Sequence, residues 1–158
     1  LGHENPFDFS LQYNPASGID RMRVGTPPVI ALAALEASLD IWETVNIKDV
    51  RETSIQLTDQ FIKGVEQKCP MLQLITPRIP ENRGSQVSFS FKHGYAVMQA
   101  CIERGVIGDF RAPDVMRFGF TPLFVDSQDV ERATEILAEI MSKDLWNDPK
   151  FQKRNKVT

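Results

Sequence analysis

The chain has 158 residues, which is enough for one compact domain with a sizeable core. It is 42% hydrophobic and 25% charged with a net charge of −3, so it lacks the basic excess of proteins that bind nucleic acid or anionic membranes. No stretch of the sequence reaches the ~20 apolar residues of a membrane span. We therefore expect neither nucleic acid nor a membrane as a partner.

The cysteines and histidines do not form a metal-binding pattern. Cys69 and Cys101 lie far apart without C-x-x-C spacing, and His3 and His93 are too few and too scattered to complete a ligand set. We expect no metal site and, because unpaired cysteines are typical of reducing compartments, a cytoplasmic location. The chain opens without an initiator methionine or a signal peptide pattern, which indicates a processed chain or a segment of a longer protein.

The N-terminal part combines an irregular arm with a helix. Residues 1–23 contain prolines and aromatics without helical or strand periodicity, so we expect an apolar arm that lies on another surface. A helix is predicted from Pro27 to about Val45, with Thr26 as its N-cap. Alanines fill much of the rest of this helix, so several faces are expected to be buried. The apolar face consists of Leu32, Leu35, Leu39 and Trp42.

The middle of the chain predicts helix, strand, strand and helix. Asn46 is expected to cap a helix that runs to Lys68 and is ended by Cys69-Pro70. Strands are predicted over 71–76 and over 85–91, where apolar and polar residues alternate. A third helix is predicted over 94–104, with Gly105 as its C′ glycine.

The last third predicts short strands followed by a helix. Extended pieces are expected over 106–110, 115–120 and 122–125, and Asp126 caps the final helix, whose core face runs from Val130 to Met141. Taken together, the elements indicate an α+β fold in which helices cover a small antiparallel or mixed sheet.

Thr26 is the first residue with possible site chemistry. A helix N-terminus attracts anions because its first N–H groups lack partners. Here, however, Pro27 and Pro28 have no N–H, so two of these donors are missing. From the residues alone, a simple N-cap is favoured over an anion site.

Arg117 is the second candidate. If residues 115–119 form a strand, Val115, Arg117 and Gly119 share one face, and the glycine leaves room for a ligand above the sheet. The planar guanidinium matches a carboxylate bidentately. An ion pair with a structural carboxylate, Asp109 or Asp114, is an equally good interpretation. Neither histidine has a nucleophile or base nearby in sequence, so no catalytic residue is assigned.

Several motifs resemble the C-terminal portion of bacterial kynureninases. These motifs are "GTPPV" near the start, "RGSQVSF" in the middle, and "GVIGDFRAPDVMRFGFTPLF". Kynureninases are pyridoxal-phosphate enzymes of the aspartate-aminotransferase fold type. The resemblance implies that residues 27–158 are the C-terminal small domain with its leading helix, and that residues 1–26 are an irregular arm from the side of the large domain.

The resemblance also implies site residues. Thr26 matches a residue that contacts the phosphate of pyridoxal 5'-phosphate in the neighbouring subunit of a homodimer with shared active sites. Arg117 matches the arginine that binds the substrate's α-carboxylate. His3 and Gly25 match residues beside the substrate.

The implied function is hydrolysis of L-kynurenine, or its 3-hydroxy form, to an anthranilate and L-alanine in tryptophan catabolism. Neither tyrosine of this chain is followed by lysine, so the Tyr-Lys pair that carries the family's cofactor lysine is absent. We therefore expect the chain alone to be inactive. One alternative is a non-catalytic interaction module derived from such an enzyme; another is a cysteine desulfurase of the same fold type, against which the "GTPP" and "FRAPDVMRFG" runs speak.

Overall fold

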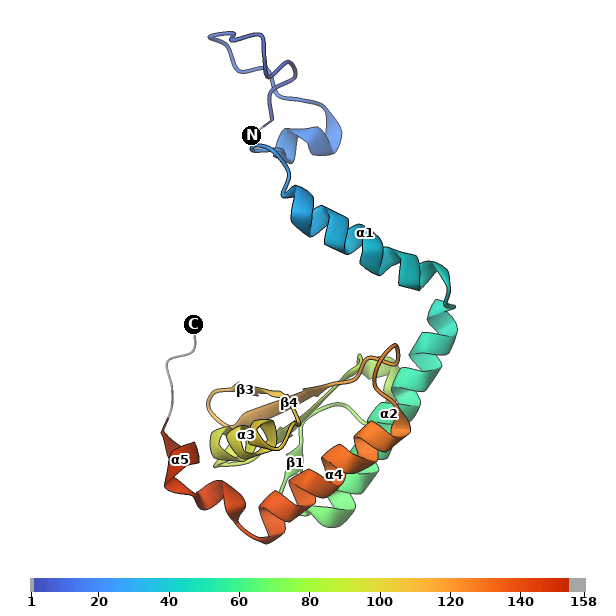
Figure 1. Cartoon of the computed structure of the whole chain (residues 1–158), viewed down its shortest axis with the longest axis vertical. Coiled ribbons are helices and arrows are strands. Elements are labelled where there is room, and N and C mark those ends of the chain that lie inside the picture. The colour runs from blue at the N-terminus through green and yellow to red at the C-terminus, as the bar shows by residue number, and fades with distance from the viewer. Residues whose placement is uncertain (1, 154–158) are drawn as a thin grey trace. The chain divides into compact units, whose positions relative to one another are not determined.

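A computed structural model describes residues 2–153, which divide between Asn46 and Ile47 into two compact units. Figure 1 shows the elements of each unit along the chain. This division lies twenty residues beyond the boundary expected between arm and small domain. It separates compact bodies rather than evolutionary domains, so the boundary at residue 26 stays a prediction.

The first unit contains a short 3-10 helix, Gly18–Met22, and the helix α1, Val29–Glu43. Backbone hydrogen bonds close the arm on itself, from Gly2 N to Arg21 O at 2.7 Å and from Ala16 N to Gly2 O at 3.0 Å. The arm is therefore more ordered than its irregular sequence suggests.

The predicted start of α1 was wrong. The N-cap is Pro28, not Thr26, and the first helical residue is Val29. The reason is steric, since a residue that precedes proline is driven out of the α region, and both Thr26 and Pro27 precede one. No residue of α1 is buried within this chain, so the expected burial of several faces is not found here.

The second unit is a four-stranded sheet with helices on one face. The strand order is β1-β2-β4-β3 and every pairing is antiparallel, which confirms the α+β class and settles the sheet as antiparallel. The strands are β1 Gln73–Leu74, β2 Gln86–Ser90, β3 Asp109–Arg111 and β4 Val115–Gly119. The main helices are α2 Ile47–Lys68, α3 Gly94–Glu103 and α4 Ser127–Ser142. Shorter pieces are η2 Pro80–Asn82, η3 Leu145–Asn147 and α5 Pro149–Gln152.

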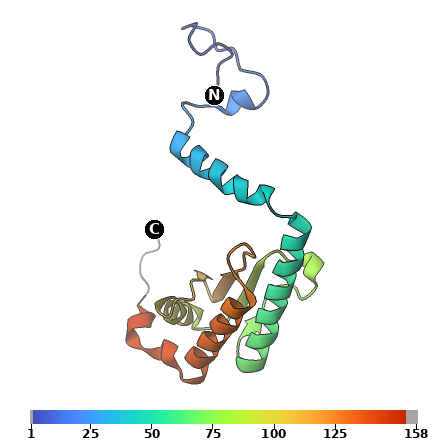
Figure 2. The ribbon, with the colours of Figure 1, turned by 45° about the vertical axis from the view of Figure 1, so that its right-hand side comes forward.

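Phe61 on α2 lies at the centre of the core of this unit. Its ring is 5.0 Å from that of Phe118 and 5.1 Å from that of Phe120, and it meets Phe89 of β2 edge to face. Helices α2 and α4 pack side by side, as Figure 2 shows. Buried residues of α2, α3 and α4 join those of β2 and β4 in one cluster.

Helix ends in the second unit follow the sequence closely. Asp126 forms a capping box with Asp129, in which each side chain accepts the other's backbone N–H. Gly105 has φ +86° directly after α3, as expected of a C′ glycine. The piece over 122–125 is a turn rather than a strand, closed by hydrogen bonds from Phe124 N and Val125 N to Thr121 O.

Candidate functional site

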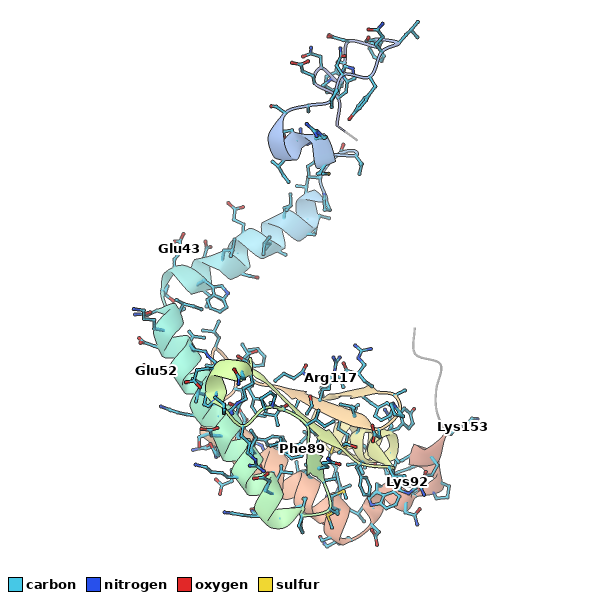
Figure 3. The ribbon with its side chains drawn as sticks, turned by 180° about the vertical axis from the view of Figure 1, so that it is seen from behind. Glu43, Glu52, Phe89, Lys92, Arg117 and Lys153 are labelled. Atoms are coloured by element: carbon cyan, nitrogen blue, oxygen red, sulfur yellow. The ribbon has the colours of Figure 1, made fainter. Side chains whose placement is uncertain are left out.

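The exposed face of the sheet carries Arg117. Met116 and Phe118 are buried in the core, whereas Arg117 is part-exposed and Gly119 exposed, so the predicted alternation along β4 is confirmed. In Figure 3, Phe89 points into the core and Arg117 lies on the opposite side of the sheet. The apolar neighbours of Arg117 in the sequence thus anchor the strand that presents it.

Arg117 lies between polar residues on both neighbouring strands. Ser88 of β2 and Asp109 of β3 are its direct cross-strand partners. Its Nη2 donates to Asp109 Oδ2, and this hydrogen bond is the main reason why the pKa of Asp109 is lowered from its ordinary value. Asp114, the other carboxylate considered, instead accepts from Ser90 Oγ at 2.5 Å. The ion-pair interpretation is therefore correct for Asp109.

The ion pair leaves most of the binding capacity of Arg117 unused. A guanidinium has five N–H donors. Within residues 2–153, the side chain of Arg117 makes one hydrogen bond, through Nη2, and its buried Nε has no partner. Its side chain is 29% exposed, and a side chain added at Gly119 would meet nothing within 4 Å. A second carboxylate can therefore reach Arg117 from the open side.

Three predicted site residues meet in the first unit. His3, Gly25 and Thr26 line a cavity of about 720 Å³ formed within the arm and the segment that precedes α1. Thr26 is exposed and, among the described residues, its hydroxyl makes no hydrogen bond. Gly25 has open space where a Cβ would stand. The structure brings these three together, whereas Arg117 belongs to the second unit.

The ring of His3 forms hydrogen bonds within the arm. Its Nδ1 accepts from Asn5 N at 2.9 Å, so the ring proton lies on Nε2, which is 3.1 Å from Gln12 O. The ring also meets Tyr13 edge to face at 6.0 Å. Both ring nitrogens thus make hydrogen bonds within the arm, and the ring forms part of the cavity wall.

The cavity of the first unit does not attract anions by itself. Its charged lining residues are Glu4, Asp20 and Arg23, which leaves an excess of negative charge. The two prolines after Thr26 also remove backbone donors. A phosphate at Thr26 would thus need cations from outside the described residues.

Other polar candidates are structural. Arg83 is buried, and it donates to Asp59 and to the carbonyls of Pro77 and Arg78, which ties the loop before β2 to α2. The ring of His93 stacks on that of Trp146 at 4.6 Å. Residues 2–153 contain no group of three or more metal-ligating side chains, and none of their helices is long and apolar enough to cross a membrane.

Sequence reasoning missed that Arg111 shares Asp109. Arg111 Nη2 lies 3.2 Å from the same Oδ2 that Arg117 contacts. The signal was present in "DFRAPDVMR", because pairing 109–111 with 115–117 as a hairpin puts Asp109 opposite Arg117 and Arg111 on the same face. The expected strand over 106–110 started too early to show it.

Comparison with known proteins links these features to one family. The family model for the kynureninase C-terminal domain matches residues 50–137. Kynureninase of Pseudomonas fluorescens is 46% identical, covering 100% of this chain and 38% of that protein. Kynureninase of Burkholderia mallei (strain SAVP1) is 43% identical, covering 99% of this chain and 38% of that protein. The chain thus spans 38% of the length of these relatives.

A solved structure supports the fold. A NifS-like protein superposes with a TM-score of 0.62 over 86% of this chain and 41% of its own, at 18% sequence identity. At this identity the likeness concerns the fold alone. It agrees with the expected small-domain fold of fold-type-I pyridoxal-phosphate enzymes.

Proposed function

This chain belongs to the kynureninase family and matches its C-terminal portion, and we propose that it is part of an enzyme that hydrolyses L-kynurenine, or 3-hydroxykynurenine, to the corresponding anthranilate and L-alanine. The observation that carries the proposal is Arg117, a part-exposed guanidinium with unused donors on an open sheet face, to which the family resemblance assigns the α-carboxylate. We place the enzyme in tryptophan catabolism, in the cytoplasm.

The role of Arg117 is to hold the substrate by its carboxylate. A bidentate pair fixes both the position and the orientation of the bound amino acid, so that the bonds to be broken stay in register with the catalytic groups. Because β4 is anchored in the core on either side of Arg117, the clamp cannot drift along the sheet. Positioning of this kind is a large part of what a protein adds to cofactor chemistry.

The residues of this chain fit one edge of pyridoxal 5'-phosphate. Thr26 offers a hydroxyl that makes no hydrogen bond among the described residues, and Gly25, which the resemblance assigns to the substrate, leaves space beside it. The acidic lining of the cavity cannot neutralise a phosphate, so Thr26 serves as one contact among several, the others coming from a partner subunit or from another part of the enzyme. When bound, the cofactor supplies an electron sink for negative charge that develops at the substrate's Cα.

We propose that the complete enzyme is a homodimer with shared active sites. The apolar side chains of α1 that are exposed in this chain support the proposal, because a contiguous apolar helix face is a typical contact surface. The chain alone should release no anthranilate when mixed with kynurenine and cofactor. If anthranilate is released, the remainder of the enzyme is not required for activity.

The alternative function is a non-catalytic interaction module, which would use the same exposed helix α1 as its contact surface. Inactivity of the complete enzyme would favour that role.

Substitution of Arg117 tests the proposal. In the complete enzyme, Arg117→Ala should lower kcat/KM for L-kynurenine by well over tenfold, since truncating one partner of a charged pair costs about 2–5 kcal/mol. Arg117→Lys keeps the charge but loses the planar guanidinium that can bind a carboxylate through two N–H groups. Its kcat/KM should lie between that of the parent enzyme and that of Arg117→Ala. Arg78→Ala is the matched control, because it removes an equal charge from an exposed pair with Glu66 away from the sheet face. Near-normal turnover by Arg117→Ala would reject the assignment.

A further inference from the structure

The ion pair between Arg117 and Asp109 has a third member. Asp109 Oδ2 accepts from Arg117 Nη2 and lies 3.2 Å from Arg111 Nη2, so one carboxylate oxygen stands between two guanidinium groups. The three side chains carry a net charge of about +1 at neutral pH. Arg111 is the more exposed arginine, with 62% of its side chain accessible against 29% for Arg117.

Strand pairing fixes this arrangement. Asp109 and Arg117 are directly opposite in the β3–β4 register, and Arg111 follows on the same face of β3. On its other side, Arg117 has Ser88 as its cross-strand partner. A long side chain held between two neighbours has already lost rotamer freedom that it would otherwise lose on binding a ligand.

We propose that Asp109 is a positioning residue that holds the guanidinium of Arg117 ready for the substrate's carboxylate, and that Arg111 keeps this site cationic. The inference rests on the proposed function of Arg117. An Arg117–Asp109 pair alone would be neutral and would repel a second carboxylate from its acidic side. Arg111 compensates the charge of Asp109, so that the site keeps an attraction for one carboxylate while Arg117 keeps its orientation.

Two substitutions at Asp109 separate its hydrogen bond from its charge. Asp109→Asn loses the charge, but its amide oxygen can still accept from Arg117 Nη2. Asp109→Ala loses both. A positioning role requires that Asn preserves most of the function and that Ala does not, whereas a purely electrostatic role requires that the two behave alike.

The experiment uses the holoenzyme and two ligands. L-kynurenine carries the carboxylate. The amine that corresponds to kynurenine without its carboxylate serves as the second probe, because its binding should not depend on Arg117, Asp109 or Arg111. Asp109→Ala should lower kcat/KM for L-kynurenine about tenfold, chiefly through KM, and Asp109→Asn by less than threefold. The inhibition constant of the amine should change by less than twofold in both variants. Thermal unfolding of each variant checks that the sheet is intact.

The role of Arg111 is tested by the salt dependence of KM for L-kynurenine. Arg111→Ala should raise KM for L-kynurenine about threefold in low salt, and the effect should vanish near 0.5 M salt, because a charge that acts from an exposed position is screened. Arg111→Lys keeps the charge and should restore the parent value. An effect of Arg111→Ala that persists in high salt would contradict an electrostatic role.

The outcomes distinguish the inference from the function beneath it. If Arg117→Ala leaves the preference for the carboxylate-bearing ligand unchanged, the proposed function fails. If Arg117→Ala removes this preference but Asp109→Ala behaves like the parent, the positioning role alone fails. Tighter binding of L-kynurenine by Asp109→Ala would show that Asp109 competes with the substrate, and would also overturn the inference.

Discussion

Two of the helix caps predicted from the sequence, at Asp126 and at Thr26, should differ in their effect on stability. Asp126 accepts from Asp129 N at 2.9 Å, and Asp129 accepts from Asp126 N at 3.1 Å, so each helps to satisfy the start of α4. Asp126→Ala removes the first of these bonds and a negative charge at the positive end of the helix. We expect a loss of about 1 kcal/mol in the free energy of unfolding, and a fall in Tm of about 4 °C for a unit of this size.

Thr26→Ala should cost almost nothing by the same measure. The helix begins at Val29, so the Thr26 side chain caps no amide of α1, and exposed substitutions usually change stability by less than about 0.5 kcal/mol. The comparison therefore tests the structure against the sequence pattern, which predicts a cap at both positions.

Tryptophan fluorescence during urea unfolding separates the two units. Trp146 packs beside the core of the second unit, and it reports on Asp126→Ala in a Trp42→Phe background. Trp42 lies in α1, and it reports on Thr26→Ala in a Trp146→Phe background. A loss on Thr26→Ala that equals the loss on Asp126→Ala would refute the assigned start of α1. An Asp126→Ala variant as stable as the parent would refute the capping box.

Three further predictions follow from the second unit. Phe61→Ala should destabilise it by about 3–5 kcal/mol, measured by urea unfolding, because the ring fills the centre of the core; a smaller loss would mean that Phe89 and Phe118 collapse into the space. Burial raises the pKa of Cys69 to about 11 and that of Cys101 to about 12, so neither thiol should react with a disulfide reagent at pH 8 until urea unfolds the chain, and rapid labelling of the native protein would contradict their burial. Because Arg117 lowers the pKa of Asp109, their pair stabilises the fold above the ordinary aspartate pKa of about 3.9, and this contribution is lost as the pH falls through the lowered value. In Arg117→Met the pKa of Asp109 should rise, which carboxyl NMR titration can measure. An unchanged pKa would show that Arg117 does not cause the lowered value.

Periodicity predicted the helices of the second unit well, because their apolar faces are long and regular. The helix from Asn46 to Lys68 and the helix after Asp126 were found within a residue or two of their expected ends. The start of α1 was missed because two opposing rules apply to "TPP". Proline is favoured at the first helical position, but here a second proline forbids the helical conformation of the first.

The partner of Arg117 was left open between Asp109 and Asp114 because the hairpin that joins β3 to β4 was not recognised in the sequence. Asp109 and Asp114 are both close in sequence, and which of them meets Arg117 depends on the register of β3 against β4. The structure also orders β3 beside β4 and puts β2 on the other side, which brings Ser88 next to Arg117 although they lie 29 positions apart in the sequence. Such non-local pairing is a property of the sheet and not of any local pattern.

The alternation of core and site residues along β4 has a thermal consequence. Met116 and Phe118 are buried on either side of Arg117, so the backbone beneath the guanidinium belongs to the most protected part of the unit. A residue on a loop loses its geometry through local opening, well below the melting temperature. Arg117 can lose it only when the sheet itself opens. If Arg117 binds a carboxylate as proposed, its binding geometry should persist on warming until the core unfolds and should then be lost in the same cooperative step.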